Sequence, residues 1–294
     1  MARDQKPQAD PKRIDYVSGK LLAKLRKAER DFCMPLAGRR VVVGVSGGWD
    51  SLALLALLVR YKHIAPEKPV LFAAYAAFRG PRPAPPPLEL LSFVERLPAV
   101  PGLCGLRLSG GPAQAVPFLS VGLKKEAANC GRCRLIRREL LLKTARALGA
   151  EVLALGHHAE DFGETLLLNL IYSATCEGMA PHLRYFNRYS VVRPLVYLTK
   201  KEIRTLGKLL GFPPPPPPCP LAGEVRRNSV RAMVEALARR NRHVVTNLMS
   251  ASLKSLGLRP AKTPPSFPLL GSPGQNKSPQ VEKKSASSSG LPVS

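Results

Sequence analysis

A glycine-rich turn is the first place where residue types and spacing suggest chemistry. The segment Ser46-Gly47-Gly48-Trp49-Asp50-Ser51 separates a Val-rich strand pattern at 39–45 from a strongly apolar helix pattern at 52–58. Two glycines let the backbone approach an anion closely, and the free N–H groups of a helix start favour phosphate. Ser46 and Ser51 supply hydroxyl donors, while Asp50 either caps the helix or helps to hold Mg²⁺. The turn matches neither G-x-x-x-x-G-K-[ST] nor G-x-G-x-x-G, and it predicts a phosphate site of another type.

A second polar segment follows the apolar strand pattern at 152–156. The carboxyl ends of parallel strands meet at one edge of a sheet, so residues 156–164 are expected to face the glycine turn. Asp161 and Glu164 are predicted to hold Mg²⁺ or water around a nucleotide, and a neutral His157 to bond a phosphate or a base. Two adjacent histidines are as often plain polar loop residues, and that alternative stays open.

Two of the six cysteines have a spacing that suits a metal centre. Cys130 and Cys133 are separated by two residues, and thiols at that spacing can point at one ion or cluster. Structural zinc takes four ligands, and the chain holds no second C-x-x-C, which leaves Cys219 as a third candidate. Three thiolates suit a 4Fe–4S cluster with one open iron, whereas reduced bystander thiols are the plainer alternative. The remaining cysteines are interpreted as apolar filler: Cys33, Cys104 and Cys176.

The charge of the chain predicts a polyanionic partner. The sequence carries 45 Lys and Arg residues against 20 acidic ones, a formal net charge of +25. Phosphate contacts release condensed counterions, so nucleic acid explains this excess better than a small metabolite does, although a basic tail that only aids solubility is the bland alternative. Residues 1–13 lack the apolar core of a secretory signal, and no apolar run approaches the roughly 18 residues of a membrane span. A cytoplasmic protein without a membrane partner is expected.

The alternation of strand and helix patterns predicts an α/β fold, an open parallel sheet with helices on both faces. Strands are predicted at 39–45, 69–75, 152–156 and 189–195, and helices at 134–148, 161–172 and 200–210. Little is predicted between 79 and 116, and the six prolines at 213–218 indicate polyproline II. The predicted parts are a basic helical arm (1–38), the nucleotide-binding domain (39–222), a basic helical C-terminal extension (223–258) and a disordered Pro/Ser/Lys tail (259–294).

The order of these motifs resembles the tRNA 2-thiocytidine synthetase family of PP-loop ATP pyrophosphatases. The matching segments are Ser46–Ser51, Cys130–Arg138, Gly156–Asn169, Glu177–Pro181, Arg193–Leu195 and Cys219. The resemblance spans about residues 20–255 and is weak between 78 and 116. Trp49 stands where many members carry Lys, which removes a positive charge near the phosphates and predicts altered affinity rather than lost function. Ala222 stands where a second late cysteine is frequent.

The resemblance implies an ATP-dependent enzyme that replaces a base oxygen of tRNA by sulfur. ATP would adenylate the C2 oxygen of an anticodon-loop cytidine, and sulfur would then displace AMP to give 2-thiocytidine. The implied catalytic residues are Asp50, Asp161 and the 4Fe–4S ligands Cys130, Cys133 and Cys219, with Asp161 near Mg²⁺. The implied ATP contacts are Ser46, Gly47, Gly48, Asp50, Ser51 and Gly156, to which the chemistry above adds His157. The implied partners are tRNA and a sulfur donor such as a cysteine desulfurase, with a homodimer left open.

Three other functions share some of these features. A lysidine-type amidotransferase would use the same glycine turn without the three cysteines. A 2-thiouridine synthetase of the zinc-finger-bearing group would carry N-terminal cysteines, and residues 1–32 contain none. A non-catalytic RNA-binding module with a decayed nucleotide site is the third, with Trp49 as its first sign. Iron content and ATP–pyrophosphate exchange, with and without tRNA, separate these functions.

Overall fold

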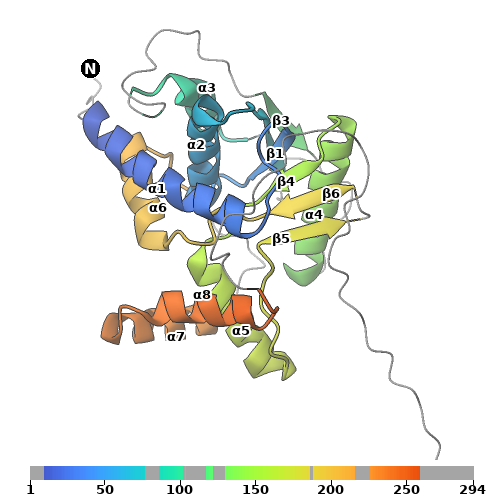
Figure 1. Cartoon of the computed structure of the whole chain (residues 1–294), viewed down its shortest axis with the longest axis vertical. Coiled ribbons are helices and arrows are strands. Elements are labelled where there is room, and N and C mark those ends of the chain that lie inside the picture. Colours follow the sequence, from blue (N-terminus) through green and yellow to red (C-terminus); the bar gives the residue numbers. More distant parts are fainter. Residues whose placement is uncertain are drawn as a thin grey trace, which may run out of the picture. The chain divides into compact units, whose positions relative to one another are not determined.

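In the part of the chain that the structure describes, six strands form one sheet with the order β3-β2-β1-β4-β6-β5 (Figure 1). Neighbouring strands are parallel throughout, except that β5 pairs antiparallel with β6 at one edge. Central β1 is a run of valines that suits burial on both faces of a parallel sheet. The strands are β1 (Arg40–Val45), β2 (Val70–Ala76), β3 (Phe118–Val121), β4 (Val152–Ala154), β5 (His182–Tyr185) and β6 (Tyr189–Val192).

The computed structural model describes residues 10–76, 86–101, 103, 117–121, 130–185, 188–215 and 226–258. For Ala76, Phe118, Ser120, Val121 and residues 130–134 only the backbone is described. Several predictions from the sequence therefore lie outside the described residues: those for Cys104, Cys219, Ala222, the last three prolines of 213–218 and the tail at 259–294.

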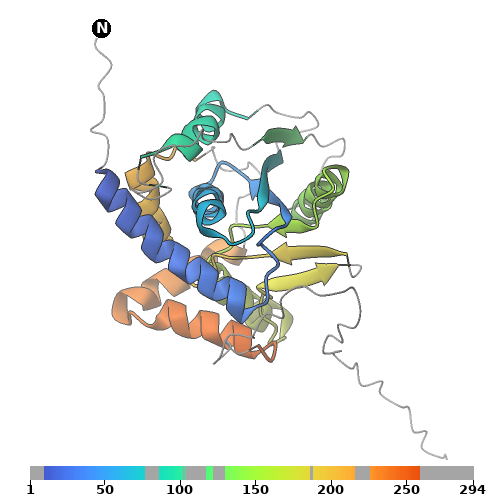
Figure 2. The same ribbon diagram turned by 45° about the horizontal axis from the view of Figure 1, so that its top comes forward.

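Helices cover both faces of the sheet, as the α/β prediction requires (Figure 2). Successive strand residues point to opposite faces, so Val41 and Val43 join a core cluster with α2, whereas Val42 joins a second cluster with Leu141 and Ala145 of α4. The first face also receives α1, α3 and α6. The α-helices are α1 (Pro11–Asp31), α2 (Trp49–Ile64), α3 (Leu88–Arg96), α4 (Cys130–Ala147), α5 (Ala159–Ser173), α6 (Lys200–Leu210), α7 (Arg226–Arg240) and α8 (Val244–Lys254).

The N-terminal helix α1 is part of the core. Its apolar stripe is buried, with Leu25 and Ala28 fully inaccessible to solvent, and it packs against α2 and α6. Two ion pairs connect the same elements, because Lys24 Nζ lies 2.8 Å from Glu202 of α6 and Arg60 Nη2 of α2 lies 2.7 Å from Asp15. The predicted helical arm is therefore a packed helix whose apolar side chains belong to the core.

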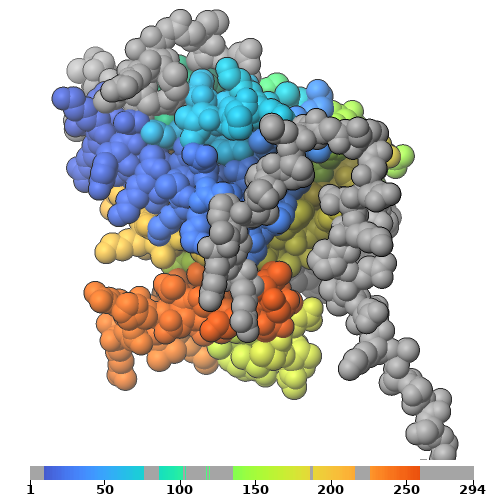
Figure 3. Space-filling view, viewed as in Figure 1, coloured from blue at the N-terminus to red at the C-terminus, as the bar shows by residue number. Residues whose placement is uncertain are grey.

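The C-terminal helices α7 and α8 pack on α5 (Figures 1 and 3). The contact between α5 and α8 is close at Gly163, where a Cβ atom would lie 2.8 Å from Cβ of Leu248. Helix α8 also reaches the loop before β5, since the Met179 N–H donates to Ser252 Oγ at 3.2 Å. These helices thus hold α5 and the loop around Met179 in place.

Some elements depart from the sequence predictions. Helix α3 and strands β3 and β5 were not predicted, since a Pro-rich context and short strands give weak patterns. The predicted strand at 189–195 ends at Val192, and the predicted helical extension at 223–258 divides into α7 and α8 at residues 241–243. None of the described helices is long and apolar enough to cross a membrane.

Candidate active site

The glycine turn connects β1 to α2 through a network of internal hydrogen bonds. The Ser46 N–H donates to Ser51 Oγ at 3.1 Å, the Ser51 hydroxyl donates to the Gly48 carbonyl at 2.7 Å, and the Gly48 N–H donates to Ser46 Oγ at 3.3 Å. Gly47 has φ +80°, a left-handed conformation that favours glycine. The turn is therefore fixed in shape, with a helix start at Trp49 behind it.

The polar segment after β4 lies directly against this turn. A Cβ atom at Gly156 would lie 2.8 Å from the Asp50 carbonyl oxygen and 3.0 Å from the Ser51 nitrogen. Asp161 closes the start of α5, because its Oδ2 accepts from the His158 N–H at 3.0 Å. The two segments that the sequence predicts to meet at the sheet edge do so.

Both segments line a cleft of about 550 Å³, within the size range of small-ligand sites. Other walls come from α4, the loop before β5, the end of β6 and α7. Residues that line it include Ser46, Asp50, Ser51, Leu135, Arg137, Arg138, Leu141, Gly156, His157, Asp161, Met179, Arg193, Arg227 and Arg231. The cleft thus gathers most of the predicted ATP contacts.

Five arginines make the cleft suited to a polyanion. Arg137 and Arg138 come from α4, Arg193 from the end of β6, and Arg227 and Arg231 from α7. Burial lowers the pKa of Arg193 to about 10, which leaves its guanidinium charged at neutral pH. Guanidinium groups bind phosphate oxygens in a bidentate manner, so phosphates are the ligands that this lining favours.

His157 is neutral at physiological pH. Burial lowers its pKa to about 4, and the nearby charge of Arg193 acts in the same direction. Its Nδ1 is buried and has no hydrogen-bond partner among the described residues. A neutral ring at the cleft wall can donate to or accept from a phosphate or a base.

His158 connects the acidic groups of the two segments. Its Nε2 lies 3.6 Å from both Asp50 and Asp161, and its Nδ1 lies 2.9 Å from Glu160. Burial disfavours the charged ring, but the Glu160 hydrogen bond and the carboxylates outweigh it and raise the pKa of His158. Desolvation also raises the pKa of Asp50, partly offset by His158.

The structure corrects the expectation that Glu164 holds a metal ion or water. Glu164 is 3% exposed, and its carboxylate accepts from Arg227 Nε at 2.9 Å and from Arg231 Nε at 3.0 Å. Arg227 also bonds Asp161 at 3.1 Å. The buried carboxylate therefore orients two cleft arginines. The sequence signal for these arginines was their spacing of four residues on a predicted basic helix.

The cysteines are placed only in part. Cys130 and Cys133 occupy the first turn of α4, and their side chains are outside the described atoms. Cys219, the third predicted ligand, lies outside the described residues. Cys33 and Cys176 are exposed, so interpreting them as apolar filler was wrong. Exposed thiols have no periodic pattern that could have distinguished them in the sequence.

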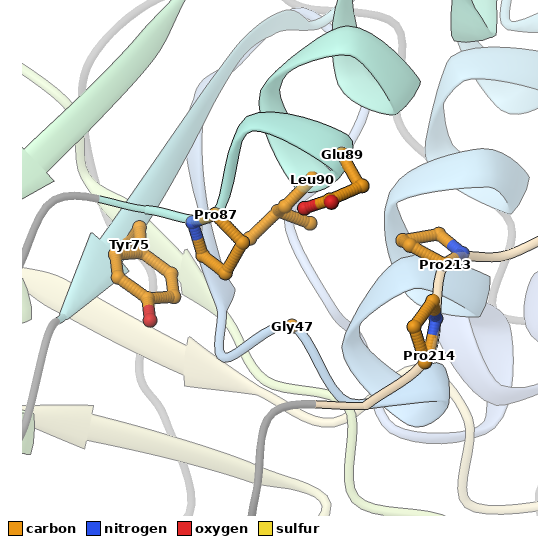
Figure 4. Close-up of a pocket in the computed structure, with 7 residues that line it drawn as sticks. All are labelled: Gly47, Tyr75, Pro87, Glu89, Leu90, Pro213 and Pro214. Carbon is orange, nitrogen blue, oxygen red and sulfur yellow. The ribbon is translucent and has the colours of Figure 1, made fainter.

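A small cavity of about 30 Å³ lies beside the glycine turn (Figure 4). Gly47 lies between Tyr75 and Pro87 on one side and Pro213 and Pro214 on the other. The turn is therefore enclosed by the end of β2, the start of α3 and the chain after α6.

Known proteins share the sequence pattern and the fold of this chain. Residues 122–235 match the PP-loop domain family. The chain is 32% identical over 230 residues to the tRNA-cytidine(32) 2-sulfurtransferase of Shigella dysenteriae, covering 74% of this chain and 68% of the relative. It is 30% identical over 249 residues to the enzyme of the same name from Syntrophotalea carbinolica, covering 81% and 91%.

A solved structure shares the fold. The U34-tRNA thiolase NcsA from Methanococcus maripaludis, solved with its [4Fe-4S] cluster, superposes with a TM-score of 0.62 at 18% identity, covering 87% of each chain. The α/β fold predicted from the sequence is confirmed. Extensive identity to sulfurtransferases that act on tRNA, together with the two facing loops of the cleft, shows that the chain belongs to the tRNA-cytidine(32) 2-sulfurtransferase family.

Proposed function

We propose that this chain is an ATP-dependent tRNA sulfurtransferase that converts an anticodon-loop cytidine to 2-thiocytidine. One observation carries the proposal: the glycine turn, the His157–Asp161 segment and five arginines line the same cleft as the face of α4 that follows Cys130 and Cys133. The arginines and the glycine turn support phosphate binding in the cleft, and the start of α4 beside it supports a role for Cys130 and Cys133.

The residues of the two loops would bind ATP and orient it for attack. The N–H groups at the start of α2 would donate to the phosphates, while the hydrogen bonds among Ser46, Gly48 and Ser51 keep the turn in shape. Gly156 has no side chain and so lets the second loop approach the backbone of Asp50. The C2 oxygen of the cytidine attacks the α-phosphorus, pyrophosphate leaves, and the base carries an AMP ester. Sulfur then bonds to C2 while AMP departs with the oxygen.

The arginines would stabilise the charges that move in both steps. Arg227 and Arg231 are held by Glu164 with part of each side chain facing the cleft, so they need little reorganisation to receive pyrophosphate or the RNA backbone. Preorganised donors of this kind are most effective where the site excludes water. The neutral His157 would contribute one directed hydrogen bond to the base or a phosphate.

Mg²⁺ fits Asp50 better than Asp161. Asp50 lines the cleft, and among the described residues its carboxylate makes only a long contact, 3.6 Å to His158 Nε2, so its oxygens are available to a hard cation. Asp161 already bonds Arg227 and the His158 N–H. We therefore assign the predicted Mg²⁺ to Asp50 and not to Asp161, whose carboxylate is paired with Arg227. Bound Mg²⁺ would neutralise the charge on the phosphates.

The position of the C-x-x-C turn supports a 4Fe–4S cluster. Positions 130, 133, 137 and 141 share one helix face by periodicity, and Arg137 and Leu141 of that face line the cleft. Cys130 and Cys133 would hold the cluster with Cys219 as third ligand. When bound, the cluster would supply the sulfur-carrying iron that the reaction needs. tRNA, a sulfur donor such as a cysteine desulfurase and a cytoplasmic location belong to this proposal.

The test is anaerobic purification followed by iron and sulfide analysis and by tRNA thiolation. We expect one 4Fe–4S cluster per chain, lost together with 2-thiocytidine formation in Cys133→Ser. The matched control is Cys176→Ser, an exposed thiol that should leave both unchanged. If iron-free protein still thiolates tRNA, the cluster assignment is wrong. If the protein forms lysidine in place of 2-thiocytidine, the proposed reaction is wrong.

A further inference from the structure

The residue in the middle of the glycine turn points away from the cleft. Trp49 is the chain's single tryptophan and the first residue of α2. It is absent from the residues that line the cleft, and its indole instead packs against the end of α6. A lysine at this position would bring a cation near the phosphates, so the role of the indole has to come from its own contacts.

Three contacts fix the indole. Its Nε1–H donates to the Pro213 carbonyl at 2.9 Å. Its ring meets Phe212 edge-on, with centroids 5.9 Å apart, and Phe212 meets Phe93 of α3 in the same manner at 5.2 Å. It also lies over Gly207 of α6, where a Cβ atom would be 2.7 Å from Trp49 Cε3. A ring held on three sides gives the start of α2 a fixed position relative to α6.

The bonded carbonyl belongs to a wall beside the phosphate turn. Pro213 and Pro214 lie across the small cavity from Tyr75, with Gly47 between them (Figure 4). Prolines have no N–H, so the backbone at these two positions has no donor with which to anchor itself. The indole N–H provides that anchor, and it comes from the residue next to Gly48 of the phosphate turn.

We propose that Trp49 is a positioning residue, whose indole fixes the phosphate turn against α6 and the Pro213–Pro214 wall and thereby sets the affinity for ATP. The inference rests on the proposed function, because it assigns ATP to the turn. The side chain of Trp49 does not line the cleft. Its contacts restrict the conformations of the turn before ATP binds, so the turn loses less conformational entropy on binding.

Two substitutions of Trp49 distinguish a positioning role of the indole from the simple lack of a positive charge at this position. Trp49→Phe keeps an aromatic ring and removes the N–H, whereas Trp49→Lys supplies a cation and removes the ring. We expect both to raise the Kd of Mg·ATP, measured by calorimetry, by about 3- to 10-fold, the range for one hydrogen bond. The KM for ATP in tRNA-dependent AMP formation should rise by the same factor while kcat at saturating ATP holds. Tighter binding by Trp49→Lys, or unchanged binding by Trp49→Phe, would overturn the inference.

A third variant reaches the same contact from α6. Gly207→Ala puts a methyl group against the indole ring, and the exposed neighbour Lys208→Ala is its matched control. We expect Gly207→Ala to shift the fluorescence emission of Trp49 and to weaken ATP binding, and Lys208→Ala to do neither. A shifted emission with unchanged ATP affinity contradicts the inference. If the unaltered chain does not bind ATP, the proposed function fails together with the inference. If the unaltered chain binds ATP and the variants bind it equally well, only the role of Trp49 is overturned.

Discussion

Gly156 lies against the backbone of Asp50 with no room for a side chain between them. A methyl group at position 156 would lie 2.8 Å from the Asp50 carbonyl oxygen, and 2.9 Å from its carbonyl carbon. Both partners are backbone atoms of the first turn of α2, so neither can rotate away as the end of a long side chain could. The two loops of the cleft are therefore coupled at this contact.

Gly156→Ala should separate the loops. Relief of the clash requires backbone movement, and overpacking of this kind costs about 1–3 kcal/mol. We expect a lower thermal midpoint and a larger loss of tRNA-dependent AMP formation, because the phosphate turn moves. The comparison is Gly257→Ala after α8, where a Cβ atom meets nothing within 4 Å and φ is +69°. That variant should lose about 1 kcal/mol of stability through backbone strain and keep its activity. Equal activity in the two variants would remove the loop contact from the mechanism.

Glu164→Gln should release the cleft arginines. The variant keeps the shape of the side chain and removes the charge that orients Arg227 and Arg231. Hydrogen bonds to charged groups contribute about 1–3 kcal/mol, so the free energy of unfolding should fall by that amount. The control is Glu139→Gln, an exposed partner of Lys143 four residues away, for which at most about 0.5 kcal/mol is expected. Urea denaturation measures both, and equal effects would contradict the structural role of Glu164.

His157 should make the protein sensitive to mild acid. Its folded pKa of about 4 lies below the ordinary 6.5, so below pH 6.5 the unfolded chain binds a proton that the folded chain does not. The stability from a neutral His157 is full above about pH 6.5 and is lost as the pH falls toward 4. The loss amounts to about 3 kcal/mol over that window.

His157→Asn isolates this contribution from other histidines. The pKa values of His182 and His63 are lowered by burial as well, and both act in the same direction in either protein. We expect the plot of unfolding free energy against pH between about 4 and 6.5 to be flatter in the variant, by up to about 1.4 kcal/mol per pH unit. Parallel plots for the two proteins would show that His157 titrates normally.

Ser252→Ala should loosen the cleft wall at Met179. Ser252 is fully buried, and its hydroxyl oxygen accepts the Met179 N–H. An unpaired buried N–H costs about 1–3 kcal/mol, so the melting temperature should fall and ATP should bind more weakly. Ser255→Ala is the control, because Ser255 donates to the Ser252 carbonyl and leaves no N–H unpaired. A change of similar size in both variants would mean that helix α8 as a whole, and not this bond, is responsible.

The sequence predicted the parts of the site that depend on local pattern. Apolar runs identified β1 and β4, and the polar residues after them defined both loops, because parallel strands end at one edge. Glu164 pairs with Arg227, which is 63 positions away in the sequence. A carboxylate next to a phosphate motif has the same sequence pattern whether it binds a metal ion or a guanidinium, so the sequence could not distinguish the two. The direction of Trp49 depends on Gly207 and Phe212, which no local pattern connects to the turn. Such contacts are set by the packing of α6, and only the assembled fold shows them.

The burial of α1 has a consequence for synthesis on the ribosome. Leu21, Leu25 and Ala28 are translated early, yet their neighbours on α6 follow nearly two hundred residues later, as the pair Lys24–Glu202 illustrates. Until α6 has emerged, only α2 can cover the apolar stripe of α1, and the part of the stripe that α6 buries stays exposed to chaperones and to aggregation. The packing of α1 is therefore completed only after α6 has been synthesised.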